Sequence, residues 1–382
     1  MRVSHSLKNI RPSYIREILT EAKKPGVISL AGGLPATEFL PVDLFESALK
    51  SIADEPELYQ YGETLGHRPL IDYLQENSSV ANHKTMICSG SQQGLDLIAR
   101  AFLNKDDTIV LEAPSYLGAL QVFELTQANI EAVTQQADGP DLNALEQLFT
   151  TKDVQFFYGV PDFHNPTGVS WSTQKREGVA ALCKKHNVFF IEDAPYRELQ
   201  FGDNMAPLVS SFCPEKSVLL QSFSKSVTPG IRLASVSASE WVIDELIKLK
   251  QAADLHSALP LQAALLHVLQ HADYPSHLKN VCAKYESRYQ FIAKKLEALK
   301  QYGCTFNTVE GGMFIWLALT DLDDNLVAKK LLEQGVCVVP GSVFYPQGCE
   351  SKPALRLNFS YCNPEQLSTA IGVIEKTLKE FC

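Results

Sequence analysis

Short apolar runs alternate with longer, helix-like stretches from about residue 40 to residue 250, and this alternation restricts the fold more than any other feature. Runs 155–160, 188–191 and 218–220 are short and almost wholly apolar, which is typical of strands buried on both faces. Strands separated by helices build mostly parallel sheets with helices on both faces. We therefore predict an α/β large domain over 40–250, with a ligand at the carboxyl ends of its strands.

A lysine comes soon after one of these strands. Ser-Phe-Ser-Lys occupies 222–225 after the run 218–220, and Arg232 comes seven residues after Lys225. A lysine at the end of a buried strand is costly to desolvate as a cation, so its pKa falls and its neutral amine can bond to a carbonyl carbon. Two hydroxyls and an arginine nearby suit a phosphate dianion. Taken alone, so short a motif more often marks a surface turn.

A second strand ends in a carboxylate. The run 188–191 leads into Glu-Asp, and Tyr196 lies three residues after Asp193. Pyridoxal 5′-phosphate (PLP) needs an acid opposite its ring nitrogen, because the protonated ring is what withdraws electrons. Asp193 fits that role, and the Tyr196 hydroxyl is placed to reach the phenolic oxygen of the ring. The adjoining Ala-Pro equally allows Asp193 to cap a turn.

Three further strand ends supply polar or aromatic groups. Asn165, in an Asn-Pro-Thr-Gly turn, follows the run 155–160 and is placed to share the phenolic oxygen with Tyr196. The glycine-bearing turn 89–94 opens a helix-like stretch, whose free N–H groups and dipole favour an anion. Tyr116 comes soon after another strand-like run, where it either stacks on a flat ring or packs in the core.

These segments, in this order, resemble the fold-type I PLP-dependent aminotransferases of the aspartate aminotransferase superfamily. Within it the chain is most similar to the 2-aminoadipate aminotransferase group, and it is also related to kynurenine aminotransferases and to the aminotransferase domain of MocR-type regulators. The resemblance covers nearly the whole chain, and its main segments are 28–35, 90–97, 111–116, 165–168, 196–199, 222–225 and 311–316.

The resemblance implies a role for each candidate residue. Lys225 bonds to the cofactor and moves the substrate Cα proton, Asp193 pairs with the ring nitrogen, and Tyr196 completes the catalytic set. The residues implied in cofactor binding are Ser91, Gln92, Tyr116, Asn165, Asp193, Tyr196, Ser222, Ser224, Lys225, Arg232 and Tyr61. Tyr61 matches a family tyrosine that reaches the phosphate of the partner subunit, so the expected assembly is a homodimer with shared sites.

The residues implied in substrate binding are Arg356, Asn165, Gly33, Ser13 and Arg16. Arg356 is expected to hold the substrate α-carboxylate through two parallel hydrogen bonds. Ser13 and Arg16 match the stretch that contacts the substrate side chain in aminoadipate-type enzymes, and they equally fit the exposed face of an amphipathic helix. Two departures from the family pattern are Pro195, directly before Tyr196, and His164, directly before Asn165.

Composition sets outer limits. The chain has 382 residues, 45% of them hydrophobic, which is enough for a second, smaller α+β domain over 1–39 together with 251–382. The net charge of −10 argues against nucleic acid as a partner, and no apolar run predicts a membrane span or a secretion signal, so we expect a cytoplasmic protein. Nine cysteines without a Cys-x-x-Cys pair indicate neither a disulfide framework nor a metal site.

The expected activity is transfer of an amino group from an L-amino acid to a 2-oxo acid such as 2-oxoglutarate, by a ping-pong mechanism. The favoured donor is 2-aminoadipate, or a broad range that includes glutamate, kynurenine, aromatic and branched-chain amino acids. A PLP-dependent lyase or racemase on the same scaffold, or a non-catalytic sensor of PLP or an amino acid, stays open. A nicotinamide dehydrogenase is disfavoured, because no Gly-x-Gly-x-x-Gly turn opens the first strand–helix unit.

Overall fold

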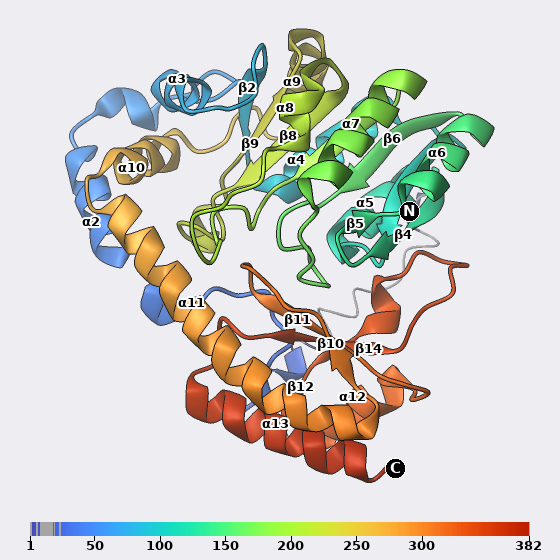
Figure 1. Ribbon diagram of the computed structural model, residues 1–382. Coiled ribbons are helices and arrows are strands. Elements are labelled where there is room, and N and C mark those ends of the chain that lie inside the picture. Colours follow the sequence, from blue (N-terminus) through green and yellow to red (C-terminus); the bar gives the residue numbers. More distant parts are fainter. Residues whose placement is uncertain (1, 5–6, 8–17, 19, 23, 382) are drawn as a thin grey trace.

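The fold was analysed in a computed structural model that describes residues 2–4, 7, 18, 20–22 and 24–381. An eight-stranded sheet forms the centre of its larger part, in the order β2-β9-β8-β7-β6-β3-β4-β5 (Figure 1). Neighbours from β8 to β4 pair in parallel, whereas β9 and β5 run antiparallel to theirs. The strands are β2 Lys84–Cys88, β3 Thr108–Ala113, β4 Asn129–Gln136, β5 Gly139–Pro140, β6 Val154–Gly159, β7 Phe189–Asp193, β8 Ser217–Ser222 and β9 Ala234–Ala238.

Alternate residues of the central strands enter two separate cores. Phe157 of β6 and Phe190 of β7 pack with Trp171 on one face, whereas Tyr158 and Ile191 belong to the core on the other. Burial on both faces explains why these strands read as continuous apolar runs. The mostly parallel α/β sheet with helices on both faces is therefore confirmed. Helices α4 Ser91–Phe102, α5 Leu117–Thr126 and α9 Glu240–Ala253 cover one face, and α6 Leu142–Thr151, α7 Thr173–His186 and α8 Val209–Phe212 cover the other.

A smaller part is built from both ends of the chain. Its four-stranded antiparallel sheet has the order β10-β11-β14-β13, and a separate two-stranded parallel sheet pairs β1 with β12. The strands are β1 Ile28–Ser29, β10 Thr305–Phe306, β11 Phe314–Ala318, β12 Val336–Cys337, β13 Val339–Pro340 and β14 Ala354–Asn358. Its helices are α11 Tyr274–Leu296, α12 Asp324–Glu333 and α13 Pro364–Lys379. The long α11 leads into it from the larger part (Figure 1).

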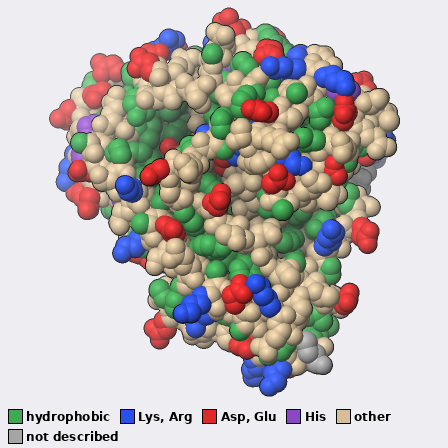
Figure 2. Space-filling model, in the orientation of Figure 1, with side chains coloured by type: hydrophobic (Ala, Val, Ile, Leu, Met, Phe, Trp, Pro, Cys, Tyr) green, Lys and Arg blue, Asp and Glu red, His purple; other side chains and the backbone are tan. Residues whose placement is uncertain are grey.

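Helix α10, Leu259–Gln270, packs against α2, Val42–Ser51, and α3, Arg68–Glu76, so this segment lies beside the larger part (Figure 1). The domain boundaries predicted above stay a prediction. In the described part of the chain, no helix combines the length and apolar character needed to cross a bilayer. On the face seen in Figure 2, Lys and Arg side chains are scattered among Asp and Glu side chains rather than gathered into a stripe.

Candidate active site

A cavity of about 260 Å³ lies at the carboxyl ends of the central strands, where the two parts of the molecule meet. Every described residue that the sequence proposed for the site lines it, except Tyr61. The lining residues are Gly33, Ser91, Gln92, Tyr116, Val160, Asn165, Asp193, Pro195, Tyr196, Ser222, Ser224, Lys225, Pro229, Arg232 and Arg356. The two parts of the molecule thus bring together residues that are far apart in the sequence, such as Ser91 at the start of α4 and Arg356 on β14, which are 265 positions apart.

The Lys225 amine projects into this cavity from the turn after β8. Its Nζ donates to the carbonyl oxygen of Gly33 at 2.6 Å. Burial and the positive charges of Arg232 and Arg356 lower the pKa of Lys225 to about 8. An amine with so low a pKa is partly neutral near pH 7, and it is then available as a nucleophile and a base.

Asp193, the last residue of β7, is buried with one oxygen engaged and one free of protein partners. Its Oδ2 accepts from the Tyr158 hydroxyl at 2.8 Å, and its Oδ1 has no hydrogen-bond partner among the described residues. Burial raises the pKa of Asp193 to about 7. A protonated ring nitrogen would supply both the missing donor and a positive charge, so the residues present fit PLP at this point.

Tyr158 is a site residue that the sequence analysis missed, because it reads as one more apolar member of the run 155–160. It lies opposite Ile191 in the β6–β7 pair, two residues before Asp193. Residues two apart in a strand share a face, so the Tyr158 ring comes up beneath the carboxylate. The signal that the sequence offered for Tyr158 was a hydroxyl-bearing residue in an otherwise apolar strand, next to the strand that ends in Asp193.

Asn165 links Tyr196 on one side of the cavity to Arg356 on the other. Its Nδ2 donates to the Tyr196 hydroxyl at 3.3 Å, and its Oδ1 accepts from Nη1 of Arg356 at 2.8 Å. Asn165 and Tyr196 are therefore adjacent, as they must be if both are to contact the phenolic oxygen of the cofactor ring. Pro195, the departure noted before Tyr196, lines the same cavity and leaves this contact intact.

Arg356, on β14, is a buried guanidinium held between two aromatic rings. Its Cζ lies 4.5 Å from the ring centroid of Phe314 and 5.0 Å from that of Phe344. Nη2 donates to the carbonyl oxygen of Ala31, and Nε has no hydrogen-bond partner among the described residues. Burial lowers the pKa of Arg356 to about 10, so it remains a cation at neutral pH. A carboxylate is the natural partner for a cation in this setting.

The opposite end of the cavity is built to hold an anion. Helix α4 begins at Ser91, whose buried hydroxyl has no partner among the described residues. The preceding Gly90 has φ +84°, and a Cβ there would collide with the guanidinium of Arg232. Arg232 Nη1 lies 3.4 Å from the Ser224 hydroxyl. A helix N-terminus, an arginine and serine hydroxyls suit a phosphate group.

Comparison with known proteins decides the family. The class I and II aminotransferase family matches residues 26–374. The chain belongs to this family. It is 33% identical to a 2-aminoadipate transaminase of Thermus thermophilus, over 97% of this chain and 94% of that protein. A solved kynurenine aminotransferase of Pyrococcus horikoshii, in complex with pyridoxamine phosphate, superposes with a TM-score of 0.94 at 30% identity, over 99% and 97% of the two chains.

The same comparison also finds a helix-turn-helix transcriptional regulator of Bacillus subtilis, 28% identical over 99% of this chain and 79% of the regulator. The resemblance inferred from the sequence motifs is thus confirmed, both to the aminoadipate group and to the regulators. The fold is that of the fold-type I enzymes, the chain is a PLP-dependent aminotransferase, and its cofactor is PLP.

One described residue proposed for this aminotransferase's site, Tyr61, does not line its cavity. Tyr61 is 80% exposed, and its ring makes an edge contact with His256 of the same chain, with 6.0 Å between ring centroids. Ser13 and Arg16 lie outside the described residues. Among the residues that are described, no group of three or more His, Cys, Asp or Glu side chains is arranged to hold a metal ion.

Behind the cavity of the aminotransferase lies a buried polar cluster that the sequence did not reveal. Glu112 Oε1 accepts from Trp171 Nε1 at 3.1 Å and from Gln135 Nε2 at 3.0 Å, whereas Oε2 lies 4.0 Å from His164 Nε2. Burial raises the pKa of Glu112 to about 8 and lowers that of His164 to about 3. His164, noted above as a departure from the family pattern, hydrogen-bonds to the Thr167 hydroxyl and is absent from the cavity lining. Its side chain therefore lies in the protein interior rather than in the site.

Replacing Glu112 with glutamine should change how stability depends on pH. The raised pKa means that folding favours the neutral acid, so the contribution of Glu112 is complete below pH 4.5 and is lost as pH rises towards 8. Relative to Glu112→Gln, the wild type should therefore lose about 2–4 kcal/mol of unfolding free energy between pH 5 and pH 9, since one pKa unit corresponds to about 1.4 kcal/mol. Urea unfolding at both pH values tests this, and parallel pH curves would contradict it.

Proposed function

We propose that this aminotransferase moves the amino group of an L-amino acid to a 2-oxo acid, commonly 2-oxoglutarate, by a ping-pong mechanism. The observation that carries the proposal is one cavity holding the Lys225 amine, the Arg356 guanidinium and the Asp193 oxygen that has no hydrogen-bond partner among the described residues. Arg356 can hold the α-carboxylate of only one substrate at a time. The amino donor and the 2-oxo acid acceptor therefore bind one after the other, as a ping-pong mechanism requires. Bound PLP supplies an electron-withdrawing ring, and the protein's residues supply everything else.

Each residue's proposed role follows from its surroundings. Ser91, with the α4 N-terminus, and Arg232 hold the phosphate, and the charge of Asp193 keeps the ring nitrogen protonated. The further groups proposed to fix the cofactor are the Asn165 amide and Tyr196 hydroxyl at the phenolic oxygen, Tyr116 on the ring face, and Gln92, Ser222 and Ser224 near the phosphate.

Lys225 is proposed to take and return the proton at the substrate Cα. Its lowered pKa keeps part of its amine neutral at physiological pH, as a base requires. Arg356, fixed between Phe314 and Phe344, holds the α-carboxylate in one plane, and the Gly33 carbonyl lies within reach of the lysine. With the carboxylate fixed, the Cα–H bond keeps one direction relative to Lys225, which favours proton transfer.

For the donor we propose 2-aminoadipate, or a broad range including glutamate, kynurenine, aromatic and branched-chain amino acids. The similarity to a 2-aminoadipate transaminase and to a kynurenine aminotransferase supports this choice. Ser13 and Arg16 are proposed to meet the distal carboxylate of an acidic donor. The regulator of Bacillus subtilis favours one alternative, a sensor that binds PLP or an amino acid without turnover, and a lyase on the same scaffold is the other.

We further propose a cytoplasmic homodimer in which Tyr61 completes the partner's site. A tyrosine that is 80% exposed and does not line its own cavity is available to a second subunit. C2 dimers are the commonest closed assemblies, which supports the proposal on general grounds. None of the eight described cysteines is in a disulfide, as is usual in a reducing compartment.

The absorbance spectrum of the PLP-loaded enzyme tests the activity directly. We expect single amino acids from a panel of 2-aminoadipate, glutamate, kynurenine and leucine to convert the visible cofactor band to that of pyridoxamine phosphate. Adding 2-oxoglutarate should reverse the change. The ranking of the panel then identifies the donor class, whereas a cofactor band that no amino acid converts would support the sensor, and 2-oxo acid released without an acceptor would support the lyase.

A further inference from the structure

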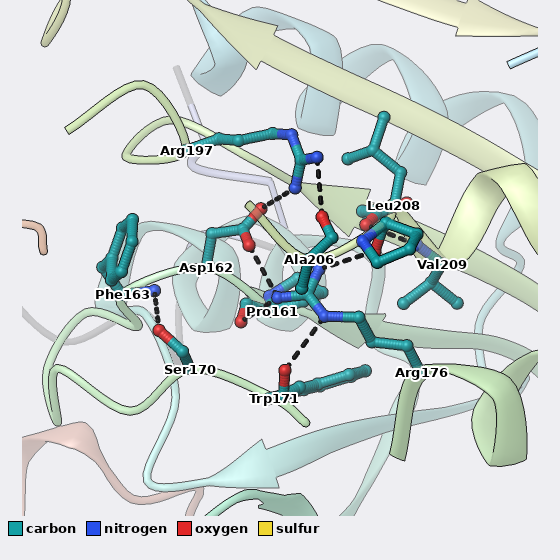
Figure 3. A network of polar contacts seen from close by, with 12 residues as sticks. Pro161, Asp162, Phe163, Ser170, Trp171, Arg176, Arg197, Ala206, Leu208 and Val209 are labelled. Atoms are coloured by element: carbon teal, nitrogen blue, oxygen red, sulfur yellow. Dashed lines mark hydrogen bonds and ion pairs between the residues drawn. The ribbon is translucent and has the colours of Figure 1, made fainter. Parts of the chain in front are cut away.

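A buried ion-pair network fixes the connection between β6 and α7 without lining the cavity (Figure 3). At its centre is Arg176, whose side chain is 1% exposed. It donates to three carbonyl oxygens, those of Trp171 at 3.0 Å, Pro207 at 3.1 Å and Pro161 at 3.0 Å, and to Oδ1 of Asp162 at 2.6 Å. Arg176 therefore supplies a positive charge for Asp162 and ties the connection down through three further hydrogen bonds.

A second arginine shares the same carboxylate. Arg197 Nη1 donates to Oδ2 of Asp162 at 3.0 Å, and its Nη2 donates to the carbonyl oxygen of Ala206 at 2.7 Å. Desolvating a second guanidinium beside one carboxylate is costly, and the fold of the connection does not need it because Arg176 already pairs with Asp162. The cost suggests that Arg197 does something more than anchor this loop.

The positions of these residues in the chain indicate what that is. Asp162 is three residues before Asn165, and Arg197 directly follows Tyr196. The segment from Asp162 to Asn165 is buried, and Asn165 itself lies in a turn that the backbone N–H of Gly168 closes by donating to the carbonyl of His164 at 2.6 Å. The Asp162–Arg197 pair therefore joins the two segments whose side chains meet at 3.3 Å in the cavity.

We propose that Asp162 and Arg197 are positioning residues, which hold the Asn165 amide and the Tyr196 hydroxyl together at the phenolic oxygen of PLP. This inference rests on the proposed function, because it assumes the cofactor orientation given there. Neither residue lines the cavity, so each acts through its neighbour. Two donors at an anionic oxygen lower the pKa of that oxygen, and a slight separation of the donors weakens this effect.

The test is the pH at which the visible absorbance band of the PLP-loaded enzyme changes by half. In Arg197→Gln we expect this midpoint to rise by about one pH unit, because the phenolic oxygen loses well-placed donors. Arg197→Lys keeps a charged donor for Asp162 and should return the midpoint close to that of the wild type. If Arg197→Gln does not fold, Arg197→Met, which keeps the length of the aliphatic stem, replaces it.

Arg288→Gln is a matched control. Arg288 is also a buried arginine with one carboxylate partner, Glu38, and one carbonyl partner, Ser360, and it lies on α11 away from the cavity. Its loss should lower the melting temperature while leaving the midpoint unchanged. An Arg197 variant that lowers the melting temperature but keeps the wild-type midpoint would overturn the positioning role alone. A wild-type protein with no cofactor band would overturn the proposed function and this inference together.

Discussion

Replacing Lys225 with alanine should lower kcat by about 10⁴-fold or more for any amino donor, because one side chain supplies both the covalent attachment and the base. The end of the cavity proposed to hold the phosphate, with Ser91 and Arg232, is untouched by the change. We therefore expect Lys225→Ala to retain PLP without covalent attachment. Single-turnover and steady-state assays measure the first effect, and borohydride reduction followed by mass measurement of the protein measures the second.

A suitable control is Lys248→Ala. Lys248 is an exposed lysine whose ion pair with Glu245, three residues away on α9, lies outside the cavity. Its removal should change kcat by less than about twofold, since surface ion pairs contribute little. Turnover by Lys225→Ala at the rate of this control would show that the proton is moved by another group, and the mechanism proposed here would be wrong.

Much of the cavity could be predicted because parallel strands deliver their carboxyl ends to one edge of a sheet. Asp193 ends β7, and Lys225 and Asn165 follow soon after β8 and β6, so each could be placed from the apolar run before it. The fold class followed from the same runs.

The contacts that tune these residues could not be predicted in the same way, since they depend on register and on loops that pack across the fold. Tyr158 reaches Asp193 only because β6 and β7 pair with Tyr158 opposite Ile191. Asp162 and Arg197 are 35 residues apart and resemble ordinary charged loop residues in the sequence. Periodicity identifies which residues are buried, but it does not identify which buried polar groups are partners.

Replacing Asp193 with asparagine should lower kcat by about 10³-fold, because a neutral amide cannot hold the cofactor's ring nitrogen in its protonated form. Asparagine has nearly the same size and can still accept the hydrogen bond from Tyr158, so the cavity should keep its shape. Tyr158→Phe removes only that hydrogen bond and leaves the carboxylate. We expect kcat of Tyr158→Phe to fall by about tenfold. Comparing the two variants separates the effect of the Asp193 charge from the effect of the hydrogen bond that Tyr158 donates to it.

Without cofactor, the same Asp193→Asn variant should be more stable than the wild type at alkaline pH. Burial raises the pKa of Asp193 to about 7, so its stabilising contribution is complete below pH 4 and is lost as pH rises towards 7. Above that range the wild type carries a buried charge, with one oxygen that no described residue hydrogen-bonds, whereas the asparagine variant carries no charge there. We expect a gain of about 2 kcal/mol in unfolding free energy at pH 8 relative to pH 5.

The two Asp193 measurements together distinguish a cofactor-binding acid from a structural one. An acid that only capped a turn would cost stability when replaced and would leave the cofactor spectrum alone. If the acid serves PLP, replacing it should lower the activity of the enzyme and raise the stability of the cofactor-free protein. The reason is that the charge of the acid is costly until the ring nitrogen pairs with it. Near-normal kcat in Asp193→Asn, or a loss of stability without cofactor at pH 8, would therefore contradict the place given to Asp193 in this site.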